Sequence, residues 1–161
     1  ANVLKEVTVN IGTIRGGSED NIIPAYCTVT VDVRLPLGIT PAEITEMIKA
    51  KIHEVEPSIK VSWKRPPQIV TESTYSGTGE RITRVLAKNS KEITGDEPLY
   101  SFTSGGTDCR FWRKIGIPAI CYGPRVFAMG GVDENITIDD LVTTAKVQMG
   151  TILDFLSGEN L

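Results

Sequence analysis

The chain has 161 residues, of which 40% are hydrophobic and 23% are charged, and its formal net charge at pH 7 is -3. This length fits one medium domain or two small ones, and the composition is ordinary for a soluble globular protein with a core. The sequence has no basic excess and no apolar run of transmembrane length, so we expect neither nucleic acid nor a membrane among its partners.

Alternating apolar residues predict the first two elements. Val7, Val9 and Ile11 alternate with polar or small residues, which predicts a strand over 6–14. A second alternating run predicts a strand over 27–34. A turn rich in glycine separates the two runs, so we expect an antiparallel hairpin.

A capping box predicts the start of the first helix. Thr40 lies directly before Pro41 and three residues before Glu43, as an N-cap and its partner do, and Pro57 stops the helix. The expected apolar stripe consists of Ile44, Met47, Ile48, Ile52 and Val55. Alternation over 59–63 then predicts a third strand.

The order β-β-α-β places one helix over one face of a small sheet. It looks like a ferredoxin-like β-α-β-β-α-β unit that lacks its first strand and helix. We therefore predict an α/β protein with a partial lid or dimerisation domain over 1–70 and a second α/β domain over 71–161. The half-built first domain also leads us to expect that the chain is incomplete.

The second domain is predicted to alternate helices with short strands. We expect first a helix over 82–93 that is closed by Gly95, and then a strand over 99–103. A helix to about Lys114 and a strand over 118–122 should follow. The last helix is expected to be capped by Thr137 together with Asp140. The expected buried face of the last helix carries Leu141, Ala145, Met149, Ile152 and Leu156. A parallel crossover would bring the turn at 105–106 and the loop 123–136 to one ligand-binding sheet edge.

A glycine-rich turn lies where the strand over 99–103 meets the next helix. Two adjacent glycines allow a tight turn whose N–H groups converge, and an arginine in the first helical turn adds a planar fork of donors. These parts predict an anion seat made by Ser104, Gly105, Gly106, Thr107 and Arg110. The alternative is a plain strand–loop–helix connection in which Thr107 is the N-cap.

Three cysteines and no C-x-x-C pair predict free thiols and a cytoplasmic location. Cys27 and Cys121 are in strand-like runs and are expected to be small core residues. Cys109 lies in the predicted anion seat but has no histidine near it in sequence, so we interpret it as a packing residue.

Two ordered sets of motifs resemble a known family. The segments 10–17 (NIGTIRGG), 21–24 (NIIP) and 32–34 (DVR) look like the lid domain of the co-catalytic zinc metallopeptidases. The segments 104–111 (SGGTDCRF), 116–119 (GIPA) and 122–124 (YGP) look like the end of their catalytic domain. This family includes acetylornithine deacetylase, succinyl-diaminopimelate desuccinylase, aminoacylase and glutamate carboxypeptidase, and the resemblance covers only the second half of a typical member.

The resemblance implies hydrolysis of an amide bond by two zinc ions (or cobalt or manganese), a water molecule and a glutamate base, in a homodimer. By motif position, Asn21 would donate to the developing oxyanion and Arg34 would pair with a substrate carboxylate. The predicted anion seat would hold the carboxylate of the small substrate, an acyl-amino acid or peptide. The alternatives are that Asn21 is only the exit of a hairpin turn and that Arg34 only pairs with Asp32 or solvent.

The sequence departs from the family's pattern at one metal position. Where the family usually has a histidine four residues before a glutamate, this chain has Gly130 before Glu134. The one histidine, His53, is predicted to be a solvated surface residue of the first helix. We therefore expect no metal to bind this chain alone. Asp133 and Glu134 are candidate ligands in place of that histidine, and the alternative for Glu134 is that it caps or braces its loop.

Two hypotheses follow for the function. In the first, the chain is the C-terminal portion of a zinc-dependent amidohydrolase that cleaves an N-acyl amino acid or short peptide, and it is inactive without the N-terminal half that completes the metal cage. In the second, it is a non-catalytic carboxylate-binding or dimerisation module derived from the same fold, which the glycine at position 130 favours.

Overall fold

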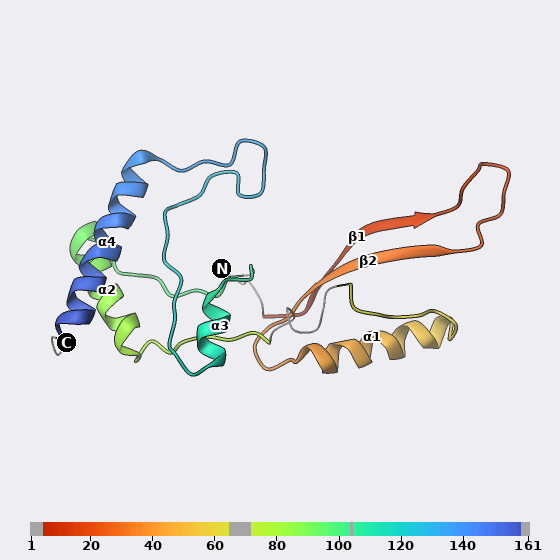
Figure 1. The fold of residues 1–161 in the computed structure, drawn as a ribbon, viewed down its shortest axis with the longest axis horizontal. Helices are drawn as coiled ribbons and strands as arrows, with labels where there is room; N and C mark the ends of the chain where they lie inside the picture. Colours follow the sequence, from red (N-terminus) through yellow and green to blue (C-terminus); the bar gives the residue numbers. More distant parts are fainter. Residues whose placement is uncertain (1–4, 65–71, 104, 159–161) are drawn as a thin grey trace. The chain divides into compact units, whose positions relative to one another are not determined.

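The computed structural model describes residues 5–64, 72–103 and 105–158, and it divides the chain into two compact units. The first unit comprises Ala1–Thr74 with Phe102–Gly105, and the second comprises Tyr75–Ser101 with Gly106–Leu161. Figure 1 follows the chain through four helices and two strands among the described residues. None of these helices combines the length and the apolar character needed to cross a membrane.

The first unit contains the predicted hairpin. Strands β1 (Thr8–Gly16) and β2 (Cys27–Arg34) pair in an antiparallel register, with an irregularity between Ile11 and Thr13. Thr13 and Thr30 add a hydroxyl–hydroxyl hydrogen bond of 2.6 Å across the ladder. The hairpin prediction is therefore confirmed.

Helix α1 (Pro41–Val55) follows the hairpin and begins with the predicted capping box. The Glu43 N–H donates to the Thr40 hydroxyl at 3.2 Å, and the Thr40 N–H donates to the Glu43 carboxylate at 2.8 Å. Within the stripe, Ile44 is buried, whereas Met47 is 60% exposed. Among the described residues α1 makes no close backbone contact with β1 or β2, so the prediction that this helix covers the sheet is not confirmed.

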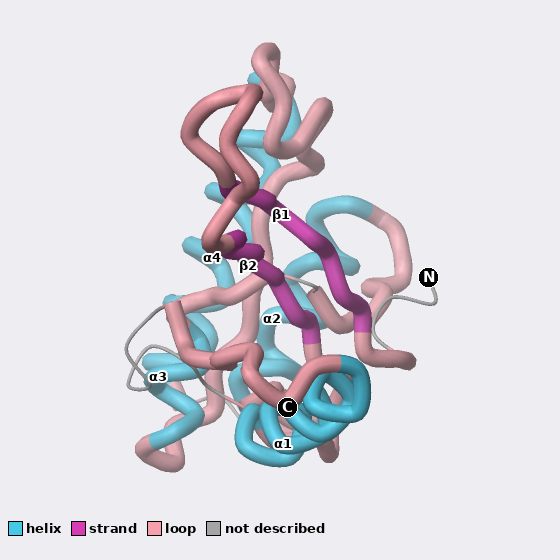
Figure 2. Tube along the Cα trace, turned by 90° about the vertical axis from the view of Figure 1, so that its right-hand side faces the viewer, coloured by secondary structure: helices cyan, strands magenta, loops and turns pink. Residues whose placement is uncertain are grey.

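The predicted third strand over 59–63 is also wrong. Figure 2 shows only β1 and β2 as strands in the described part of the chain. Instead of joining a ladder, the Ile59 carbonyl lies 3.1 Å from Nε2 of His53. Alternation sets which way side chains face, but a strand also needs a neighbouring backbone, which no described segment supplies here.

The second unit is organised around two packed helices, α2 (Arg81–Thr94) and α4 (Ile138–Ser157). Both helices follow the predicted signals: α2 ends at Gly95 in the left-handed conformation, and the Thr137 hydroxyl caps α4 by accepting from the Asp140 N–H. Val85 and Val147 are fully buried.

The predicted buried face of α4 is wrong. Its buried residues are Thr144, Val147 and Thr151, whereas Met149 and Leu156 are 64% and 77% exposed. The buried stripe of α4 is thus mostly polar, and α4 packs against α2.

The predicted strands over 99–103 and 118–122 are extended segments without ladder hydrogen bonds among the described residues. The parallel crossover and its ligand-binding edge are therefore not formed there. The backbone of Ala119 is instead held by a side chain: its N–H donates to the Ser76 hydroxyl, and that hydroxyl donates to its carbonyl, both at 2.9 Å. Between the two segments lies the short helix α3 (Cys109–Lys114), as predicted.

Candidate functional site

The glycine-rich turn leads directly into α3. The N-cap of α3 is Asp108, whose side chain makes no capping hydrogen bond. The first turn is closed by backbone bonds from Arg110 N–H to the Thr107 carbonyl at 3.2 Å and from Phe111 N–H to the Asp108 carbonyl at 3.0 Å. The alternative interpretation of Thr107 as the N-cap is therefore wrong, because the helix starts one residue later.

Arg110 folds back over the turn. A Cβ at position 106 would overlap Nη1 of Arg110, so the guanidinium occupies space that the glycine leaves open. On its other side, the guanidinium carbon lies 4.6 Å from the centre of the Phe111 ring. The guanidinium of Arg110 is thus held between the backbone of Gly106 and the ring of Phe111.

Arg110 retains a donor suited to an anion. Its Nε atom is buried and has no hydrogen-bond partner among the described residues. Because leaving a buried donor unpaired costs about 1–3 kcal/mol, an acceptor at this position would be stabilising. A carboxylate oxygen meets that need best, since charge-assisted bonds to guanidinium are among the strongest in proteins.

The remaining residues of the predicted seat are placed differently. The Gly105 N–H donates to the Thr103 hydroxyl at 3.2 Å and is thus used within the turn. Gly105 groups with the first unit, whereas Gly106, Thr107 and Arg110 belong to the second. Ser104 lies outside the described residues. The structure therefore brings Gly106 and Arg110 together, and their role in binding stays a prediction.

The two predicted lid residues lie on or beside the hairpin. Asn21 is exposed in the turn between β1 and β2, where the Ile22 N–H donates to the Glu19 carbonyl at 3.2 Å. Arg34, at the end of β2, donates from Nε to Asp32 at 2.5 Å, and both side chains are about half exposed. These positions agree with the alternatives in which Asn21 is part of a hairpin turn and Arg34 pairs with Asp32. Contact with a substrate stays a prediction for both residues.

The loop after the second extended segment is braced by its own residues. Phe127 and Asn135 form an isolated antiparallel bridge with bonds of 2.9 and 3.2 Å. Inside the bridge, the Gly130 N–H donates to the Glu134 carboxylate at 3.0 Å, and Gly130 has a φ of 77°. The sequence left open whether Glu134 ligates a metal or braces its loop. In the structure its carboxylate braces the loop.

The described residues do not make a metal cage. No group of three or more histidine, cysteine, aspartate or glutamate side chains gathers in the part of the chain that the structure describes. Glu134 is engaged with the loop backbone, and Asp133 takes part through its carbonyl, which accepts from Asn135 Nδ2 at 2.7 Å. His53 is exposed on α1, as predicted. A divalent metal therefore does not fit these residues alone.

Comparison with known proteins shows which sequences this chain is similar to. Residues 2–60 match the family described as Peptidase dimerisation domain. The chain is 30% identical over 142 residues to a succinyl-diaminopimelate desuccinylase from Roseobacter denitrificans, covering 88% of this chain and 37% of that protein. It is 27% identical over 157 residues to an acetylornithine deacetylase from Myxococcus xanthus, covering 94% of this chain and 39% of that protein.

A solved structure agrees in fold. An M20 family metallo-carboxypeptidase from Sulfolobus solfataricus superposes with a TM-score of 0.71 at 19% identity, over 92% of this chain and 36% of that one. The chain fits the M20 peptidase family. It spans less than two fifths of the length of these three proteins.

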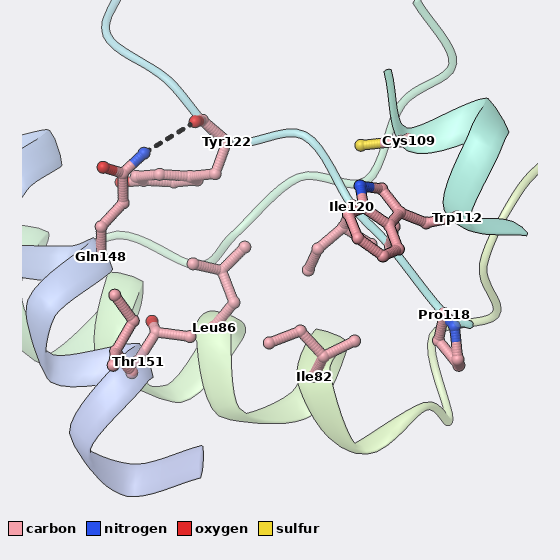
Figure 3. Close-up of a pocket in the computed structure, with 11 residues that line it drawn as sticks. Ile82, Leu86, Cys109, Trp112, Pro118, Ile120, Tyr122, Gln148 and Thr151 are labelled. Atoms are coloured by element: carbon pink, nitrogen blue, oxygen red, sulfur yellow. Dashed lines mark hydrogen bonds between the residues drawn. The ribbon is translucent and has the colours of Figure 1, made fainter. Parts of the chain in front are cut away.

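The chain also has an apolar pocket that its sequence did not reveal. The pocket, of about 440 Å³, lies in the second unit between α2, α3, α4 and the segment 118–122 (Figure 3). Ile82, Leu86 and Ile120 point into it, and Gln148 Nε2 donates to the Tyr122 carbonyl at 3.3 Å at one end. The apolar residues of α2 that the sequence pointed to include part of this lining. No signal in the sequence indicated that Gln148 would lie at the same pocket.

The predicted core positions of two cysteines are wrong. Cys27 and Cys121 are both exposed. Cys109 is partly buried at the pocket. Burial raises the pKa of its thiol, a hydrogen bond from Thr107 opposes that shift, and the neighbouring thiol of Cys121 reinforces it.

Proposed function

We propose that this chain is the C-terminal portion of a metal-dependent amidohydrolase or metallopeptidase. Its relatives carry the names of a desuccinylase, a deacetylase and a metallo-carboxypeptidase, which supports metal-dependent hydrolysis at the level of the family. The substrate is an N-acyl amino acid or short peptide, and the bond that is cleaved is its amide. In the whole protein, two zinc ions (or cobalt or manganese) would polarise the scissile carbonyl and activate water, on ligands supplied outside the described residues.

This portion binds the substrate's carboxylate and joins the subunits. The observation that carries the first role is the buried, unpartnered Nε of Arg110, held between Gly106 and the Phe111 ring. Asn21 and Arg34 contribute from the lid, one to the oxyanion and the other to a carboxylate. Residues 2–60 support the second role, since they match a dimerisation domain.

The same proposal assigns the domains and the location. A lid or dimerisation domain occupies residues 1–70, and part of the catalytic domain occupies 71–161. The protein works as a cytoplasmic homodimer on a small carboxylate-bearing substrate.

The test compares paired substrates in the whole protein. Arg110→Ala should raise KM about tenfold or more for an N-acyl amino acid, since a hydrogen bond to a charged group contributes about 1.5–3 kcal/mol. For the N-acyl amine that lacks the carboxylate, the same variant should match the parent. Arg84→Ala, an exposed arginine on α2, is the matched control. Equal losses on both substrates would remove the carboxylate role from Arg110.

A second candidate function is a non-catalytic carboxylate-binding or dimerisation module. The observation that favours it is the hydrogen bond between the Glu134 carboxylate and the Gly130 N–H. In the metallopeptidase family that the sequence resembles, a histidine is usual at position 130. This reading expects the whole protein to bind an N-acyl amino acid in calorimetry without hydrolysing it in the presence of zinc, cobalt or manganese. Turnover with any of these metals would exclude it.

A further inference from the structure

Two cysteine thiols of the second unit lie close enough to react with each other. The Sγ atoms of Cys109 and Cys121 are 3.7 Å apart, although the residues are twelve positions apart in sequence. Cys109 is the first residue of α3, and Cys121 lies in the extended segment that follows it. Figure 3 shows the Cys109 sulfur beside this segment, near Ile120. A disulfide requires about 2.05 Å between sulfurs, so a small further approach would join them.

The fold holds the two thiols opposite each other by hydrogen bonds on both sides. Nε of Arg113 in α3 donates to the Ala119 carbonyl at 2.8 Å, and the Ile117 N–H donates back to the Trp112 carbonyl at 3.0 Å. The Ser76 hydroxyl bonds both backbone groups of Ala119. These contacts fix the position of the extended segment against α3, two residues before Cys121.

We propose that Cys109 and Cys121 form an oxidisable pair, which a hydroperoxide converts into an intramolecular disulfide. The exposed Cys121 meets the oxidant first. Its thiolate attacks the peroxide, the O–O bond breaks, and a sulfenic acid forms with release of water or an alcohol. The Cys109 sulfur then attacks the sulfenic sulfur, the S–O bond breaks, and a second water leaves as the S–S bond forms. A thiol reductant reverses the sequence by exchange.

The disulfide would alter the turn next to it. Thr107 hydrogen-bonds the Cys109 thiol, and Arg110 is the next residue along α3. Cross-linking removes the thiol from Thr107 and ties the start of α3 to the extended segment. Provided that the proposed function is right, oxidation therefore changes carboxylate affinity as well as the free-thiol content.

The test is a non-reducing tryptic map of the whole protein after stoichiometric hydrogen peroxide. Cleavage after Lys91, Arg110, Lys114 and Arg125 separates the peptides 92–110 and 115–125, each with one cysteine. We expect these peptides to be joined, with the loss of two hydrogen atoms, and to separate on reduction. Cys27→Ser should give the same joined pair, and Cys121→Ser should abolish it.

Two outcomes would overturn the proposal. One is a Cys109 thiol that remains free while Cys121 proceeds to sulfinic acid, since a nearby partner would intercept the sulfenic acid first. The other is a disulfide that links either cysteine only to Cys27 or to another chain. Because the map reads covalent linkage and not turnover, its failure leaves the proposed hydrolase function untouched.

Discussion

The side-chain amide of Asn89 on α2 lies against Gly150 on α4, so closely that a Cβ at position 150 would overlap its Oδ1 atom. The amide nitrogen donates to the Asp154 carboxylate at 2.9 Å and to the Val85 carbonyl of its own helix at 3.0 Å. Asn89 is only 6% exposed. A buried amide on one helix thus fills a space that a glycine leaves open on the other.

This contact predicts that the effect of Gly150→Ala on the free energy of unfolding depends on whether Asn89 is present, which a double-mutant cycle can measure. Gly150→Ala should raise the stability of an isolated helix by up to ~1 kcal/mol. In this protein it should instead lower the free energy of unfolding by about 1–3 kcal/mol, because the added carbon overlaps Asn89. With Asn89→Ala in the background, the overlap disappears and Gly150→Ala should become neutral or stabilising. Denaturant titration of the four proteins measures the cycle. The same sign in both backgrounds would contradict the packing described.

The same contact predicts an acid-sensitive link between the helices. The pKa of Asp154 is lowered, first by the hydrogen bond from Asn89 and next by the one from Lys88, which donates at 3.2 Å. A carboxylate with a pKa lower in the folded state than in the unfolded state stabilises the fold above its unfolded pKa, and this stabilisation is lost as pH falls through the folded value. Asp154→Asn should therefore lower the melting temperature at pH 7, by an amount that shrinks as the pH falls below the unfolded pKa of about 3.9 and through the lower folded pKa.

Asp96→Asn, at an exposed position just after α2, is the matched control for that pH series. It should track the parent protein at every pH. A constant difference between Asp154→Asn and the parent across the whole range would show that the asparagine is penalised by its shape and not by its missing charge.

Local signals predicted the helices well, because a cap involves only residues a few positions apart. The Thr40–Glu43 box and the glycine at position 95 act where the sequence places them. Strand pairing depends on distant backbone, so 59–63 and 118–122 alternate or run apolar without joining a ladder in the described residues. The buried face of α4 was wrongly predicted for a related reason, since hydrophobicity alone cannot show that Asn89 of α2 packs against Gly150.

The candidate site was predicted in its residue types but not in its geometry. The motif indicated an arginine beside two glycines, and the structure adds that Gly106 makes room for the guanidinium of Arg110. It also shows that the Gly105 N–H, expected to face an anion, is bonded to Thr103. Such choices depend on rotamers and competing acceptors, which residue identity does not determine.

The close approach of Arg110 to Gly106 leads to a prediction about carboxylate binding, in addition to the one for Arg110→Ala. Gly106→Ala should push the Arg110 guanidinium from its place over the Phe111 ring and raise KM for a carboxylate-bearing substrate about tenfold in the whole protein. Gly79→Ala is the control, because a Cβ there meets no atom within 4 Å. If Gly106→Ala binds substrate as the parent does, Arg110 does not depend on that glycine.

The last prediction separates the two roles that the sequence left open for Glu134. If its carboxylate braces the loop by accepting from the Gly130 N–H, Glu134→Gln should keep that bond, since the amide oxygen of glutamine also accepts. Glu134→Ala should lose it and raise the rate of tryptic cleavage after Arg125 severalfold, because local opening exposes the loop. Asp139→Asn, in the exposed first turn of α4, should leave the cleavage rate unchanged.

A metal-binding role would give a different pattern in the whole protein. Replacing a carboxylate ligand by an amide weakens binding of a divalent cation, so Glu134→Gln would then lower the bound metal as measured by atomic emission. Because the structure pairs Glu134 with Gly130, we expect parental metal content and a parental cleavage rate in Glu134→Gln. Reduced metal with an intact loop would instead assign Glu134 to the metal site, with a neighbour bracing Gly130 once the metal is bound.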